Sequence, residues 1–127
     1  MDPLPDLRVR RVYAAAEPAD GVRVLVDRLW PRGLSRETAA VDHWCRAVAP
    51  SAELRRWFAH DPDRFEEFAR RYRDELRGPE PAAALAAIAD LWHRGPTTLL
   101  TAVRTLEVAH ATVLERVLRE RRTPASP

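Results

Sequence analysis

Three short runs of the chain have the apolar alternation or the β-branched content of strands, and they lie far apart in the sequence. Residues 7–13 alternate apolar side chains with arginine, residues 22–26 are Val-Arg-Val-Leu-Val, and residues 97–102 form an apolar, threonine-rich run between breakers. Uninterrupted runs of this kind are typical of parallel strands, whose pairing needs a helix-length connection. We therefore expect residues 22–26 and 97–102 to be adjacent, parallel central strands.

Elsewhere, apolar side chains recur at three- and four-residue steps, which predicts amphipathic helices. Ser35, Ser51 and Asp61 are residue types that cap helix N-termini, and Pro62 suits a first helical position. Gly-Pro and Pro-rich segments separate the periodic stretches. The pattern predicts helices over about residues 35–48, 51–60, 62–76, 82–92 and 105–118.

These elements predict a single α/β domain over residues 7–122, with a small, mostly parallel sheet covered by helices. Residues 1–6 and 123–127 are expected to be a disordered N-terminus and tail. Hydrophobic residues make up 46% of the chain and charged residues 31%, as in soluble globular proteins, and no apolar run approaches the ~20 residues of a membrane span. Residues 1–6 contain two prolines and two acids, unlike a signal peptide, so we expect a cytoplasmic protein with no membrane partner.

All 21 basic side chains are arginine. The absence of lysine excludes Schiff-base enzymes, pyridoxal-phosphate enzymes and Walker-type phosphate loops by their usual chemistry. The formal net charge of +2 is small, so nucleic-acid binding is not demanded. We expect no cofactor.

The single cysteine, Cys45, excludes an intrachain disulfide and a cysteine-rich zinc site. It shares a predicted helical face with Val41 and Val48, so we expect it to be buried and unreactive. The four histidines are scattered, with no His-x-x-x-His pair. We predict no metal site, although distant segments could still assemble one.

Residues 27–33, Asp-Arg-Leu-Trp-Pro-Arg-Gly, follow the second predicted strand directly. A role in the hydrophobic core does not account for the three charged side chains of this stretch. Pro31 and Gly33 make this a stiff loop, and such loops at the carboxyl ends of strands bind ligands in α/β proteins. The guanidinium groups of Arg28 and Arg32 match carboxylate or phosphate, and Asp27 can orient one of them. The alternative is a structural ion pair between Asp27 and one arginine, with Trp30 in the core.

A second group of polar residues accompanies the helices. Arg55 and His60 lie near the end of one predicted helix, and His60 titrates in the physiological range, so it could act as an acid, a base or a hydrogen-bond donor. The alternative is an exposed histidine before a capping aspartate. Tyr72 places a phenol on an apolar face, more often a buried tyrosine than a proton donor. His110 follows the last predicted strand and should lie near the same sheet edge.

Several motifs together resemble the YeaO-like proteins, grouped as domain of unknown function family 488. They are residues 24–33, Ala-Pro-Ser at 49–51 with Leu54 and Arg55, then residues 57–58 and 60–62, and finally Phe68, Arg71-Tyr72 and Glu75-Leu76. The order and spacing match from about residue 8 to residue 118. The resemblance implies a single α/β domain and carries no established activity. Some family members bear a transcriptional-regulator label, but the strand pattern here is not that of a winged helix.

The chain also departs from the family pattern. Where the family usually has an acidic residue at a strand end and then an Asn-His-Ala motif, this chain has Ala-Val-Arg-Thr at 102–105 and Ala-His-Ala at 109–111. His110 is retained without two polar partners, for which Arg104 and Thr105 could substitute. Cys45 stands where the family is usually apolar, which agrees with a structural role.

We therefore predict a cleft that binds a small anionic ligand, phosphate- or carboxylate-bearing and possibly nucleotide-like. The candidate catalytic residues are His60 and Asp27, and the candidate ligand-binding residues are Arg28, Trp30, Arg32, Arg55, Tyr72 and His110. Whether the protein is an enzyme stays open, as does its oligomeric state. The alternative is a non-catalytic nucleic-acid or protein interaction module that uses arginine-rich faces. Salt separates the two, because phosphate-backbone binding weakens steeply with ionic strength and a partly buried pocket is screened less.

Overall fold

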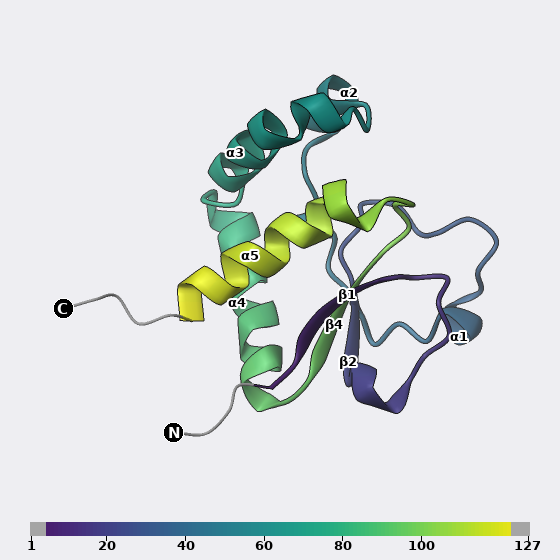
Figure 1. The fold of residues 1–127 in the computed structure, drawn as a ribbon. Helices are drawn as coiled ribbons and strands as arrows, with labels where there is room; N and C mark the ends of the chain where they lie inside the picture. The colour runs from purple at the N-terminus through teal and green to yellow at the C-terminus, as the bar shows by residue number, and fades with distance from the viewer. Residues whose placement is uncertain (1–4, 123–127) are drawn as a thin grey trace.

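The computed structural model describes residues 5–122, which form a four-stranded parallel sheet with helices around it (Figure 1). The strands are β1 (Leu7–Arg11), β2 (Val22–Leu25), β3 (His43–Trp44) and β4 (Thr97–Thr101), in the spatial order β1-β4-β2-β3. Val24 pairs with Leu99 in the β2–β4 ladder, and the direction is parallel. The prediction that these two strands are adjacent, parallel and central is confirmed, as is the α/β fold class.

The helices are α1 (Arg36–Ala39), α2 (Ala52–Phe58), α3 (Phe65–Glu75), α4 (Pro79–Arg94) and α5 (His110–Arg122). Figure 1 shows α3, α4 and α5 on one side of the sheet and α1 on the other. The larger core lies on the α4–α5 side, around Val24, Leu99 and Trp92. A smaller cluster around Leu25 and Leu100 lies on the opposite side, because successive strand residues face opposite ways.

The helix N-termini follow the predicted capping chemistry. The Ser51 side chain accepts a hydrogen bond from the Leu54 amide at 3.1 Å at the start of α2. Asp61 caps a 3₁₀ turn that begins with Pro62 and runs directly into α3. Pro79 occupies the first turn of α4, so this helix begins three residues before the predicted residue 82. A proline there costs nothing, because the first amides of a helix have no intrahelical partner.

The predicted helix over residues 35–48 is wrong beyond Ala39. Ala40 adopts a left-handed conformation with φ 50° and ends α1 after one turn. The chain then pairs with the edge of β2, where the Cys45 amide donates to the Leu25 carbonyl at 2.8 Å. Cys45 is therefore half-buried at a strand end, not buried on a helix. The start of α5 also differs, because a 3₁₀ turn over Leu106–Val108 precedes it.

A close approach of two loops fixes the start of the sheet. Gly21 has φ 61°, and a Cβ atom there would lie 2.0 Å from the Pro96 carbonyl oxygen. The next amide, of Val22, donates to that same oxygen at 3.0 Å. Only glycine fits both the conformation and the space, so Gly21 aligns β2 with β4.

The fully buried carboxylate of Asp20 forms ion pairs with three arginines. Asp20 forms ion pairs with Arg8, with Arg10 at 2.7 Å and with Arg23 at 2.7 Å. Burial disfavours the ionised carboxyl, but the Glu17 amide and the arginines Arg23, Arg8 and Arg10 outweigh it and lower the pKa of Asp20 from 3.8 to about 2. The cluster ties β1 and β2 to the turn between them.

The predicted disordered ends fall largely outside the described residues, which exclude 1–4 and 123–127. Of the N-terminal segment 1–6, Pro5 and Asp6 are described. The Pro5 carbonyl accepts from Trp92 Nε1 at 2.7 Å, and the Asp6 carbonyl accepts from the Thr97 amide at 2.9 Å. Within residues 5–122, none of the helices is both long and apolar enough to cross a membrane.

Candidate functional site

A cleft of about 820 Å³ opens at the carboxyl edge of the sheet. Three segments form its walls: the loop after β2, the loop between β4 and α5, and α2 with its flanking residues. Its polar lining residues include Asp27, Arg28, Arg32, Arg55, Arg56, His60, Arg104 and His110. Seven of the eight predicted site residues therefore line one cleft (Asp27, Arg28, Trp30, Arg32, Arg55, His60 and His110), and Tyr72 does not.

The loop after β2 is held in place by its own backbone and by neighbouring aromatic rings. Trp30 donates from Nε1 to the Leu34 carbonyl at 2.8 Å, and the Tyr13 hydroxyl donates to the Arg32 carbonyl at 3.1 Å. Gly33 has φ 78°, a conformation that other residues resist. These contacts use main-chain atoms of Arg32 and leave its guanidinium exposed toward the cleft.

Asp27 and His110 form a pair at the base of the cleft. Asp27 Oδ2 accepts from the Ala102 amide at 2.7 Å, and Oδ1 lies 3.2 Å from His110 Nε2. Burial disfavours the charged Asp27, yet the neighbouring His110, the Ala102 amide and the Thr101 hydroxyl outweigh it and lower the pKa of Asp27. Asp27 is thus ionised near neutral pH and orients other groups instead of donating a proton.

The tautomer of His110 follows from its neighbours. Its Nε2 atom lies 3.0 Å from the Val26 carbonyl oxygen, as well as close to the Asp27 carboxylate. Both are acceptors, so Nε2 must carry the hydrogen. Within residues 5–122, no hydrogen-bond partner is described for the other ring nitrogen, Nδ1.

Five arginines line the cleft against one carboxylate: Arg28, Arg32, Arg55, Arg56 and Arg104 against Asp27. All five are exposed, and within residues 5–122 none of their guanidinium groups forms an ion pair. Arginines elsewhere do: Arg70 pairs with Glu67 and Arg77 with Asp74. The cleft therefore concentrates uncompensated positive charge, which favours anions.

The α2 wall is positioned by α3. Glu75 of α3 accepts from the Ser51 amide at 2.8 Å and from its hydroxyl at 2.7 Å, which fixes the start of α2. At its other end, Ala59 and His60 adopt left-handed conformations, with φ 48° and 57°. Left-handed conformations at two successive non-glycine residues strain the backbone, and strained backbone conformations are common at functional sites. The strained turn presents His60 to the cleft.

Tyr72 lies beneath the site and not in it. It is fully buried, its hydroxyl donates to the Val48 carbonyl, and its ring meets His110 edge-on with centroids 6.1 Å apart. Burial, with the nearby negative charges, raises the pKa of Tyr72 well above its ordinary value. With no exposed surface, Tyr72 does not reach the interior of the cleft.

Two lining arginines, Arg56 and Arg104, are not among the eight predicted site residues, although the departure from the family pattern offers Arg104 as a substitute for a polar partner of His110. Arg104 follows β4 at the same sheet edge as the 27–33 loop, so the parallel pairing of β2 and β4 is the signal that finds it. Arg56 lies beside Arg55 on α2 and has no comparable signal. Among residues 5–122, no three side chains of the metal-ligating types His, Cys, Asp and Glu come together.

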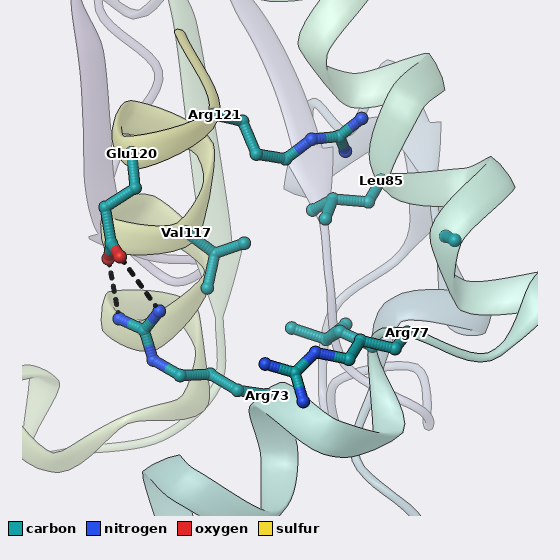
Figure 2. Close-up of a pocket in the computed structure, with 8 residues that line it drawn as sticks. Arg73, Arg77, Leu85, Val117, Glu120 and Arg121 are labelled. Carbon is teal, nitrogen blue, oxygen red and sulfur yellow. Dashed lines mark hydrogen bonds and ion pairs between the residues drawn. The ribbon is translucent and has the colours of Figure 1, made fainter. Parts of the chain in front are cut away.

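A second, smaller cavity of about 410 Å³ lies between the ends of α3, α4 and α5 (Figure 2). Leu85 and Val117 line it, and Arg73 spans one side through an ion pair with Glu120 at 2.7 Å. Because that pair already compensates the charge of Arg73, this cavity lacks the unpaired cluster of the sheet-edge cleft.

The fold and the cleft define a single-domain α/β protein with a parallel sheet and an arginine-lined cleft at the carboxyl ends of its strands. Residues 6–126 match DUF488-N3i, described as the inactive DUF488-N3 subclade. The chain belongs to the YeaO-like proteins of the DUF488 family.

Curated relatives match over nearly their whole length. The chain is 48% identical over 115 residues to the uncharacterized protein Rv3073c of Mycobacterium tuberculosis, covering 91% of this chain and 95% of that protein. It is 38% identical over 114 residues to the uncharacterized protein YeaO of Escherichia coli, covering 90% and 97%. No solved structure matches the chain.

Proposed function

We propose that this protein binds a small anionic ligand, phosphate- or carboxylate-bearing, in the cleft between the β2 loop, α2 and the β4–α5 loop. The observation that supports the proposal is that five arginines line one cleft with a single carboxylate, which is already engaged by Ala102 and His110. Guanidinium groups held together repel one another, so a bound anion would offset that cost. Arginine also binds oxyanions through two parallel hydrogen bonds.

We propose binding without catalysis. The matching subclade is described as inactive, and the Arg104 region departs from the acidic residue and the Asn-His-Ala motif of the resembled family. The ionised, hydrogen-bonded state of Asp27 suits a positioning role. The cleft arginines surround a concavity instead of following an extended face, which favours a small ligand over a nucleic-acid strand.

Thermal unfolding in the presence of phosphate or sulfate tests the proposal. Ligand at about a hundred times its Kd should stabilise the folded protein by about 2.7 kcal/mol through mass action. Arg32→Ala should remove most of that gain without unfolding the protein, because the fold uses the carbonyl of Arg32 and not its guanidinium.

Arg94→Ala is the matched control. Arg94 is an exposed arginine at the end of α4, before β4 begins, and so at the opposite sheet edge. It should keep the full phosphate response. A melting temperature that does not respond to either anion in the parent protein would refute the proposal. A stabilisation that Arg32→Ala and Arg94→Ala lose equally would show surface screening instead of a site.

A further inference from the structure

The sheet-edge cleft combines its arginines with apolar surface. Trp30, Phe58, Phe68, Val103 and Val108 are among its lining residues. Tyr13 and Leu29, the large hydrophobic side chains that stay exposed in the described part of the chain, at 42% and 68%, line it too. Exposed apolar side chains gathered at a concavity mark a binding surface. Such a lining suits a ligand that has an apolar or flat part in addition to its anion.

The size of the cleft supports the same conclusion. Its volume of about 820 Å³ lies within the range of pockets for organic ligands, roughly 300–1,000 Å³. An inorganic oxyanion fills a small fraction of that space. Phosphate alone would leave the exposed side chains of Tyr13 and Leu29 uncovered.

His110 adds a directional polar contact at the base. Its side chain is 10% exposed, and it lines the cleft. Nε2 faces the Val26 carbonyl and Asp27, and within residues 5–122 no partner is described for Nδ1. In the tautomer whose only ring hydrogen is on Nε2, Nδ1 is an acceptor. A buried acceptor that a ligand leaves unpaired costs binding energy, so it selects ligands that carry a donor.

We infer that the ligand is an organic phosphate of about the size of a nucleoside monophosphate, whose phosphate meets the cleft arginines and whose organic part donates a hydroxyl or N–H hydrogen bond to His110 Nδ1. This inference rests on the proposed anion site and names the class of ligand for it. Asp27 is a positioning residue in this arrangement, since it helps to hold the tautomer of His110.

Isothermal titration of the full chain with four separate probes tests the inference: inorganic phosphate, phenyl phosphate, adenosine monophosphate and uridine monophosphate. Phenyl phosphate has an apolar ring without a donor, so it should bind more tightly than phosphate. At least one nucleoside monophosphate should bind about tenfold more tightly again, the ratio that corresponds to about 1.4 kcal/mol. In His110→Phe, the nucleoside monophosphates should bind no more tightly than phenyl phosphate, whereas in His110→Gln, which retains an acceptor, part of that difference should return.

The two proposals fail in different ways. If inorganic phosphate binds and neither nucleotide exceeds phenyl phosphate, the inference about the ligand is overturned and the anion site stands. If none of the four probes binds, both are overturned. Should His110→Phe not fold, the comparison of phenyl phosphate with the nucleotides in the parent protein still decides the question.

Discussion

Replacement of Asp20 by asparagine should destabilise the protein strongly and in a pH-dependent way. Asp20 is fully buried against Arg8, Arg10 and Arg23, and Arg23 is itself buried. Asp20→Asn leaves those arginines without their carboxylate. Removing one partner of a buried ion pair typically costs about 3–5 kcal/mol, because the remaining charge stays desolvated.

The pH dependence follows from the lowered pKa of Asp20. The carboxyl titrates near 3.8 when exposed and at about 2 in the folded protein, a difference worth about 2 kcal/mol. Because the folded pKa is the lower one, this stabilisation is complete above the unfolded pKa and is lost as the pH falls from about 5 toward 2. Asp20→Asn cannot show this loss, so its difference from the parent should shrink by about 2 kcal/mol over that range.

Urea unfolding of both proteins at several pH values between about 2.5 and 7 measures this difference directly. Other titrating carboxyls, including Asp27, are common to both proteins and cancel. Asp90→Asn, at an exposed carboxylate on α4, should unfold like the parent. A gap between parent and Asp20→Asn that stays constant with pH would refute the reasoning, and so would a cost as small as that of Asp90→Asn.

Two further predictions concern buried groups near the cleft. Tyr72→Phe should lower stability by about 1–2 kcal/mol in urea unfolding, because it leaves the buried Val48 carbonyl without its donor; the phosphate-induced thermal shift should be unchanged, and its loss would indicate that the phenol helps to bind ligand. Cys45 should react slowly with a thiol reagent at pH 8 in the folded protein and rapidly in denaturant, because burial raises the pKa of its thiol; equal rates in both conditions would contradict this.

The strands and the main helices are predictable because their patterns are local. In β2 and β4, apolar content and flanking breakers indicate buried strands, and the long connection between them supplies the crossover that their parallel pairing requires. The caps at Ser51 and Asp61 depend on residues two or three positions away. Such information is present in a short stretch of sequence.

The stretch after α1 shows where local pattern misleads. Val41, Trp44, Cys45 and Val48 are spaced as on one helical face, but Val41 and Trp44 pack into the small cluster and Cys45 and Val48 into the large core. The two clusters lie on opposite sides of the sheet. The helical spacing is therefore produced by a segment that passes from one side of the sheet to the other at its edge. The path of this segment is set by its pairing with β2, which is not a local interaction.

The site is predictable in its sheet-edge half and less so in its α2 half. Residues 27–33, Arg104 and His110 come together because β2 and β4 are parallel and both end at that edge. The α2 wall depends on the contact of Ser51 with Glu75, 24 residues away. The orientation of Arg55 and Arg56 therefore cannot be predicted from the sequence alone.

The two arginine groups of this protein show that a carboxylate partner, and not the number of arginines, separates a structural cluster from a candidate binding site. Arg8, Arg10 and Arg23 surround Asp20, where a buried carboxylate compensates them and ties two strands together. At the carboxyl edge, five arginines line one cleft with Asp27, which is already engaged by Ala102 and His110. The charge of the first group is compensated within the folded protein. Under our proposal, the charge of the second group is compensated by a bound ligand. An anion should therefore stabilise the protein through the second group alone, and the Asp20→Asn variant, where it folds, should retain its phosphate response.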